Sequence, residues 1–224
     1  MSSNLKTLKL TFELETITIS KGRKITQKAT GLIDYEQKKT ILNVTMPQNI
    51  IYIEEKGGNQ MLFDPKRNEL LKTKSTLSLL RENVVYQFIQ NKESLGLEDR
   101  GFVVKEIKNE DGLLVKLWTP PLELSNQIST IKTVSKDGII IFKSEIDIKN
   151  RVSEKIFYTD FKNNDGHSLP MKITKFNYEF DPKKGKIIDS VVTIQKYSNI
   201  AINQNLNTQL LYYELPKDVK VILE

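Results

Sequence analysis

The chain has 224 residues, of which 38% are hydrophobic and 28% are charged, a size and balance typical of one folded domain with its own core. It contains no cysteine, which excludes disulfides, thiolate nucleophiles and cysteine-ligated metals, and no apolar run of about 18 residues that would span a membrane. The net charge of +6 suits an anionic partner, but the lysines are spread over expected hairpin tips, which favours solvated turns.

Alternation of apolar and polar residues predicts that the chain opens with paired strands. Four apolar residues near the N-terminus alternate with polar ones, and we expect their shared face to be buried: Leu8, Leu10, Phe12 and Leu14. A second strand is expected at 24–36, where Gly31 indicates a bend or a close approach of the backbone. Further strands are expected at 40–46, 49–54, 60–63 and 69–72.

One helix is predicted, over residues 76–90. Ser75 is a suitable N-cap, and apolar residues recur after it at spacings of three and four: Leu77, Leu80, Val84 and Phe88. More apolar positions widen this stripe, so the helix should be covered on more than one side. We expect its four apolar residues to pack on the concave face of the sheet.

The second half of the chain predicts a meander of antiparallel strands. The strands are expected at 102–108, 113–118, 128–134, 139–148, 153–161, 172–180 and 186–197, separated by Asn-, Asp- and Gly-rich turns. Neither a linker nor a repeat is visible, so we expect one domain over residues 1–224. A sheet of about ten or eleven strands must curl or split into layers. One helix need not fill a curled interior, and the pattern fits an apolar cavity and a packed core equally.

Sets of catalytic or metal-binding residues are not visible in the sequence. His167 is the only histidine, whereas a Ser-His-acid triad or a zinc site needs partners around it. Neighbouring acids such as Glu54 and Glu55 point to opposite faces of a strand. Gly57 and Gly58 precede a strand and not the helix that a phosphate loop requires, and the aromatic residues are not clustered as RNA binding would need. We therefore expect no enzyme activity, no cofactor, no metal and no nucleic-acid partner.

Several short stretches occur in an order and spacing that resemble a known family. They are Leu-Thr-Phe at 10–12, Ala-Thr-Gly-Leu-Ile at 29–33, Gly-Gly-Asn-Gln-Met-Leu-Phe-Asp-Pro at 57–65 and Tyr-Tyr-Glu-Leu-Pro-Lys-Asp-Val-Lys-Val at 212–221. In these stretches the chain resembles the periplasmic lipoprotein-carrier family, LolA and LolB and their relatives. The helix at 76–90 stands where that family has a helix, and the centre of the chain matches in pattern only.

The resemblance implies a mainly β fold, a half-open curled antiparallel β-barrel with a helical lid or plug over an apolar cavity. It implies a non-enzymatic cell-envelope protein that binds lipid or the acyl chains of lipoproteins, in the context of lipoprotein sorting to the outer membrane. The alternative is a periplasmic protein-interaction or envelope-stress sensor module with a filled interior. Gln37 stands where the carriers have an arginine, which favours a lipid- or lipoprotein-binding relative over the shuttle itself.

The expected ligand-binding residues are apolar positions of the family-like strands and of the helix: Leu10, Phe12, Leu14, Ile33, Tyr35, Val44, Met61, Phe63, Leu80, Val84 and Phe88. The expected partners are lipid or lipoprotein acyl chains, with peripheral contact to a membrane, and the protein is expected to be a monomer. The expected location is the periplasm or the outer membrane, with the native signal or lipoprotein anchor removed ahead of Met1.

Overall fold

The computed structural model describes residues 8–74, 83–91, 93–204, 206 and 208–223. Within these residues, fourteen strands form one continuous sheet in the order β14-β6-β5-β4-β3-β2-β1-β13-β12-β11-β10-β9-β8-β7. Neighbouring strands are antiparallel except β14 and β6, which run parallel. The sheet is larger than the ten or eleven strands expected, because every expected segment forms a strand and the C-terminal segment adds β14.

The first half of the chain forms β1 (Lys9–Ser20), β2 (Arg23–Asp34), β3 (Lys39–Met46), β4 (Ile50–Glu55), β5 (Asn59–Asp64) and β6 (Glu69–Lys74). The second half forms β7 (Val103–Glu110), β8 (Leu113–Thr119), β9 (Ile128–Lys136), β10 (Ile139–Asp147), β11 (Val152–Asn164), β12 (His167–Phe180), β13 (Ile187–Ile202) and β14 (Lys220–Leu223). Among the described residues, the helical elements are α2 (Val84–Asn91), α3 (Thr208–Leu211) and two single 3-10 turns, η2 (Glu98–Arg100) and η3 (Leu122–Leu124).

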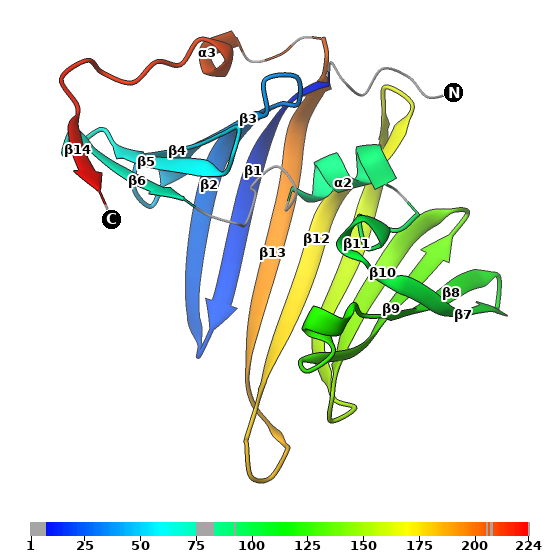
Figure 1. Cartoon of the computed structure of the whole chain (residues 1–224). Helices are drawn as coiled ribbons and strands as arrows, with labels where there is room; N and C mark the ends of the chain where they lie inside the picture. The colour runs from blue at the N-terminus through cyan, green and yellow to red at the C-terminus, as the bar shows by residue number, and fades with distance from the viewer. Residues whose placement is uncertain (1–7, 75–82, 92, 205, 207, 224) are drawn as a thin grey trace.

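Tight hairpins connect most of the consecutive strands. Gly112, Gly138 and Gly166 all have positive φ in these turns, as the Asp-Gly signals in the sequence predict. The two meanders, β1 to β6 and β7 to β13, join where β1 pairs with β13. The resulting sheet is mainly antiparallel, open at both edges and curled around α2 (Figure 1).

The concave face of the sheet carries the largest hydrophobic core. Leu8, Leu10 and Phe12 are buried in it and Leu14 is partly buried against it, which confirms the face predicted from their alternation. The helix α2 contributes Val85, Phe88 and Ile89. The remaining members come from the strands and the loop after α2: Ile33, Leu95, Ile140, Ile156, Tyr158, Leu169, Ile173, Tyr197, Ile200 and Ile202. The helix therefore fills the middle of the concave face.

The described part of the predicted helix begins at Val84. Asn83 caps it, because its side-chain Oδ1 accepts a hydrogen bond from the backbone N–H of Tyr86 at 3.0 Å. Residues 75–82, which include the predicted cap Ser75 and the predicted contacts Leu77 and Leu80, lie outside the described residues. Phe88 packs on the concave face as expected, in contact with Tyr158 of β11.

Gly31 lies where two strands bring an aromatic ring against the backbone. It pairs directly with Phe12 across β1 and β2. A Cβ atom built on Gly31 would lie 2.1 Å from Cζ of the Phe12 ring. Glycine is thus required at this position, and the close approach expected from the sequence is confirmed.

A second core covers the opposite face of β2 to β6. It consists of strand residues and of the segment around α3 that leads into β14: Leu32, Ile41, Ile51, Ile53, Phe63, Leu70 and Leu210, with Met61, Tyr213, Leu215 and Val219 packed against them. Both faces of these strands are therefore apolar, but the C-terminal segment covers one of them.

A third core lies near the β7 edge, around Trp118. The indole is fully buried, and its Nε1–H donates to Oγ1 of Thr133 at 2.9 Å. Thr133 is itself fully buried, so this hydrogen bond has no access to water.

Replacing Thr133 by valine should lower the free energy of unfolding by about 1–2 kcal/mol, because the buried indole N–H loses its acceptor while the volume is kept. Urea unfolding measures this loss. Ser125→Ala is the control, since it removes a hydroxyl that donates to the Leu122 carbonyl at the surface. Equal stabilities of the two variants would show that the buried hydrogen bond does not stabilise this edge.

Candidate functional site

A row of directly paired residues crosses the concave face from the core to the β14 edge. Phe12 pairs with Gly31, and the row continues through Leu42, Tyr52, Leu62, Leu71 and Ile222. Residues directly opposite each other on neighbouring strands share a face, so the whole row belongs to the concave side.

The row becomes accessible to solvent as it leaves the core. Leu42 still packs against the concave core, whereas Tyr52 is 37% exposed and Ile222 is 39% exposed. Leu62 and Leu71 between them are partly buried. The β4 to β14 side of the concave face therefore presents an apolar surface.

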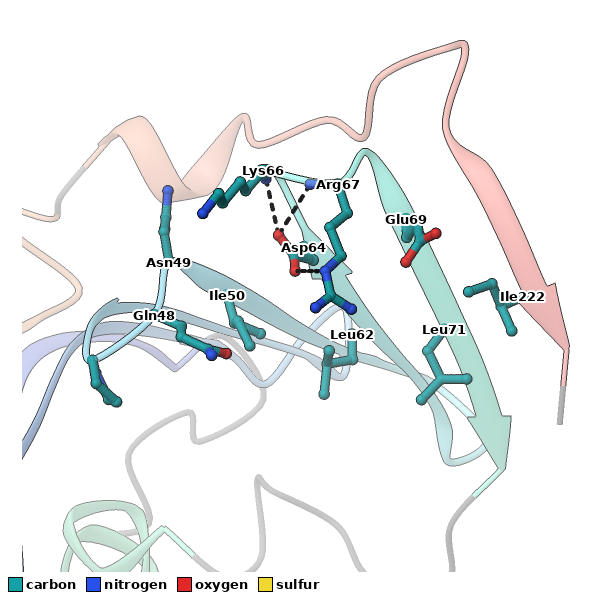
Figure 2. Close-up of a pocket in the computed structure, with 11 residues that line it drawn as sticks. Gln48, Asn49, Ile50, Leu62, Asp64, Lys66, Arg67, Glu69, Leu71 and Ile222 are labelled. Atoms are coloured by element: carbon teal, nitrogen blue, oxygen red, sulfur yellow. Dashed lines mark hydrogen bonds and ion pairs between the residues drawn. The ribbon is translucent and has the colours of Figure 1, made fainter. Parts of the chain in front are cut away.

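A cavity of about 610 Å³ lies on this accessible side (Figure 2). It is lined by Pro47, Gln48, Asn49, Ile50, Leu62, Asp64, Lys66, Arg67, Glu69, Leu71 and Ile222. Ile50, Leu62, Leu71 and Ile222 form its apolar floor. The volume falls in the range of roughly 300–1,000 Å³ that is typical of small-molecule sites.

The β5–β6 turn supplies the charged rim of the cavity. Asp64 holds the turn, because its Oδ1 accepts the backbone N–H groups of Lys66 at 2.9 Å and Arg67 at 3.3 Å. The Arg67 side chain extends from this turn toward Leu62, with its Nε 3.7 Å from Asp64 Oδ2 (Figure 2).

The rim carries a surplus of positive charge. Glu69 pairs with Lys220 at 3.1 Å, and Asp64 is the partner of Arg67. Lys66 has no ion-pair partner among the described residues. The rim thus places a cation beside an apolar floor, an arrangement complementary to an amphiphile with an anionic head.

The predicted ligand-binding residues do not line this cavity. Leu10, Phe12, Ile33 and Phe88 are buried in the concave core, and Leu14, Tyr35 and Val84 are packed at its margin. Val44 is partly buried and pairs with Ile50 of the cavity floor, which brings it nearest to the site. Leu80 lies outside the described residues.

Met61 and Phe63 lie on the other face of β5, in the core that the C-terminal segment covers. Leu62, between them, points into the cavity instead (Figure 2). Alternation could not tell which residues face the cavity, because Met61, Leu62 and Phe63 are consecutive apolar residues. Leu70 and Leu71 pose the same ambiguity in β6, and the sequence contains no signal that resolves it.

A second hollow, of about 570 Å³, lies where β1, β2 and β13 meet. Leu14, Ala29 and Tyr197 line it together with the polar residues Glu13, Glu15, Lys28, Thr30, Thr45, Lys196 and Ser198. Glu15 and Lys196 form an ion pair at 3.2 Å across it. Its polar lining makes it a weaker candidate for an apolar ligand.

Reactive groups do not gather at either hollow. Among the described residues, no three histidine, cysteine, aspartate or glutamate side chains lie close enough together to hold a metal ion. His167 begins β12 and pairs with Asn164 at the β11–β12 hairpin, away from the cavity residues. In the same part of the chain, no helix has the length and apolarity needed to cross a membrane.

Farther along the concave face, Glu154 of β11 lies between two lysines. Lys143 is 3.5 Å from one of its carboxylate oxygens, and Lys175 pairs with the other. Burial raises the pKa of Glu154, but the two lysines outweigh burial and hold the pKa below its ordinary value of 4.5. The carboxylate is therefore charged, and it is the shared ion-pair partner of both lysines.

Because the folded-state pKa of Glu154 is lowered, its contribution to stability is present above pH 4.5 and is lost as pH falls through the folded pKa. Glu154→Gln should lower the free energy of unfolding by about 2 kcal/mol at pH 7 and flatten the acid limb of the stability profile. Urea unfolding over a pH series measures both effects. Glu106→Gln, at an exposed pair with Lys108, should leave the profile unchanged. An acid limb equally steep in both variants would contradict this assignment.

Comparison with solved structures finds proteins with a similar fold. The sequence matches no protein-family model and no curated protein. The structure is similar to a DUF1329 family protein from Desulfovibrio piger, with 13% identity, a TM-score of 0.57 and coverage of 94% of this chain and 91% of that one.

Two more solved structures show the same likeness. One is a LolA superfamily protein from Nitrosomonas europaea, with 13% identity, a TM-score of 0.54 and coverage of 94% and 90%. The other is named for an outer membrane lipoprotein-sorting protein domain from Vibrio parahaemolyticus, with 12% identity, a TM-score of 0.57 and coverage of 93% and 92%. The chain therefore has a LolA-like fold, and the resemblance found in its sequence is confirmed at the level of the fold.

Proposed function

From this LolA-like fold and the cavity on its concave face, we propose that the protein is a non-enzymatic, monomeric cell-envelope protein that binds lipid or the acyl chains of lipoproteins. It acts in the periplasm or at the outer membrane, in lipoprotein sorting or a related transfer of lipid. The Vibrio parahaemolyticus structure, which is named for lipoprotein sorting, supports this setting. Because one fold can serve many functions, the proposal rests on the cavity and not on the fold alone.

The observation that carries the proposal is the apolar floor of the cavity, which is open among the described residues. Leu62, Leu71 and Ile222 continue the row that begins in the core at Phe12. The helix α2, in contrast, packs on β12, in the middle of the face. Each buried methylene of a ligand contributes roughly 0.8 kcal/mol. A chain of about 14–16 carbons would gain about 11–13 kcal/mol gross by that increment, before ordering costs. Ordering costs lower the net affinity below this gross value, which suits a protein that must release its ligand.

The cationic rim favours a ligand with an acidic head group. Arg67 stands over the apolar floor and offers a planar guanidinium to a carboxylate or a phosphate oxygen (Figure 2). Lys66 adds a second positive charge from the same turn. An acyl chain on the floor with its acidic head at the rim satisfies both features. The packed core around α2 restricts this ligand to the β4 to β14 side.

Displacement of a fluorescent fatty acid tests the proposal. Leu62→Glu should weaken fatty-acid binding by at least about tenfold, because a carboxylate on the floor must be desolvated against the chain. Leu114→Glu is the matched control, since Leu114 is a partly exposed leucine of β8 outside the cavity. Urea unfolding of both variants shows that they are folded.

A variant of the charged rim distinguishes the contribution of the ligand's acidic head group to binding from that of its acyl chain. Arg67→Gln should weaken binding of a fatty acid but leave binding of its methyl ester unchanged, whereas Arg23→Gln at the start of β2 should alter neither. Micromolar protein that binds no fatty acid, or equal binding by Leu62→Glu and Leu114→Glu, would overturn the site.

A further inference from the structure

The convex face of the central strands carries aromatic residues that the concave site does not use. Successive residues of a strand point to opposite faces, and Tyr158 points into the concave core, so Phe157 points outward. Phe157 lies in a continuous aromatic group on β10, β11 and β12. Its ring centroid is 5.0 Å from that of Phe142 and 6.0 Å from that of Phe176, whose ring in turn stacks on Tyr178 at 6.4 Å.

Aliphatic residues extend this group across β13 and β1. Val192 pairs directly with Phe176 of β12 and with Ile19 of β1. Ile194 likewise pairs with Ile17. We call these eight residues, four aromatic and four aliphatic, the convex apolar patch. Phe157 and Ile19 are each 38% exposed, so the patch is accessible on both of its sides.

Lysines lie around the convex apolar patch. Lys155 of β11 lies directly opposite Phe176 of β12, and its Nζ lies 5.7 Å from the centroid of the Tyr178 ring. Lys24 pairs with Ile19 at the far side of the patch.

A further cationic row crosses the same face next to the patch. Lys172 of β12 lies directly opposite Lys196 of β13, and Lys196 lies directly opposite Glu15 of β1. Lys28 occupies the next position of this row, opposite Glu15. Glu15 is already in an ion pair with Lys196, so the face around the patch carries an excess of positive charge.

We propose that the convex apolar patch docks the protein on the surface of an anionic phospholipid bilayer. Aromatic side chains favour the boundary between acyl chains and headgroups, and lysines can extend past an apolar contact to reach phosphate groups. Basic residues beside an apolar surface are attracted to anionic lipids. A second copy of the chain is a poorer partner, because its own cationic patch would be repelled.

The docking surface and the lipid cavity lie on opposite faces of the sheet. Membrane contact through the convex face therefore leaves the concave cavity free. The proposal does not depend on the cavity binding lipid, and each can fail while the other holds.

Co-sedimentation with vesicles tests the proposal. The protein should sediment with vesicles of phosphatidylcholine and phosphatidylglycerol, much less with pure phosphatidylcholine, and less as salt is raised. The double variant Phe157→Ser with Phe176→Ser should bind at least about tenfold more weakly. The matched control is Val103→Ser with Ile107→Ser, which removes two exposed apolar residues from the edge strand β7 and should bind as the parent does.

Lysine variants keep the test decisive if the aromatic variant does not fold. Lys24→Gln with Lys155→Gln should weaken vesicle binding by about tenfold, and Lys56→Gln with Lys105→Gln should bind nearly as the parent does. Equal binding to neutral vesicles, or equal losses in the test and control pairs, would overturn the proposal. A concentration-dependent dimer that Phe157→Ser with Phe176→Ser abolishes would also overturn it, because the patch would then join two copies.

Discussion

Replacing Phe88 by alanine is expected to lower the free energy of unfolding by about 3–5 kcal/mol, the cost of a large cavity in a packed core. Phe88 is 2% exposed, and its ring centroid lies 5.1 Å from that of Tyr158 and 5.9 Å from that of Phe161. A helix that formed a loose lid over an empty interior would lose clearly less. Urea unfolding of the variant therefore measures how firmly α2 is docked on the sheet.

The matched control is Tyr212→Ala, because Tyr212 is an aromatic residue that is 81% exposed. This control should change the free energy of unfolding by less than about 0.5 kcal/mol. A Phe88→Ala variant that loses no more than the control would mean that α2 does not pack in solution as the structure shows.

The second large effect is expected at Gly31, where valine should cost about 3 kcal/mol, the upper end for overpacking a core. The added Cβ would lie 2.1 Å from Phe12 Cζ and 2.5 Å from Phe12 Cε2, so the ring must leave its place over the strand. That ring also packs against Tyr197, with the centroids 5.5 Å apart, and its displacement disturbs the junction of β1 and β13. Urea unfolding measures the loss.

A double-mutant cycle identifies the cause. In a Phe12→Leu background the clash is relieved, so Gly31→Val should cost at least about 1 kcal/mol less than in the parent. Strictly additive costs would contradict the steric explanation. They would point instead to the backbone conformation of β2 as the reason for glycine.

Local periodicity was sufficient to predict the strands and one buried face. Leu8, Leu10 and Phe12 alternate with polar residues, and the structure buries them together. The Asp-Gly pairs likewise predicted hairpins, and positive φ at Gly112 and Gly138 shows why glycine is needed there. These features depend on neighbours in sequence, which a single chain displays directly.

Features that depend on distant segments could not be predicted. β14 pairs in parallel with β6, and Lys220 of one reaches Glu69 of the other. The C-terminal segment around Leu210 also covers one apolar face of β2 to β6. Nothing in β5 itself tells which face is covered, and it is Leu62, between the expected residues Met61 and Phe63, that lines the cavity.

Photo-crosslinking with a diazirine-bearing fatty acid, followed by peptide mapping, tests the central claim most directly. The acyl chain should label peptides that contain Ile50, Leu62 or Leu71, because these residues form the cavity floor. An excess of unlabelled fatty acid should suppress the labelling, and Leu62→Glu should reduce it. Labelling confined to the convex strands, or labelling that unlabelled fatty acid does not suppress, would contradict a lipid site on the concave face.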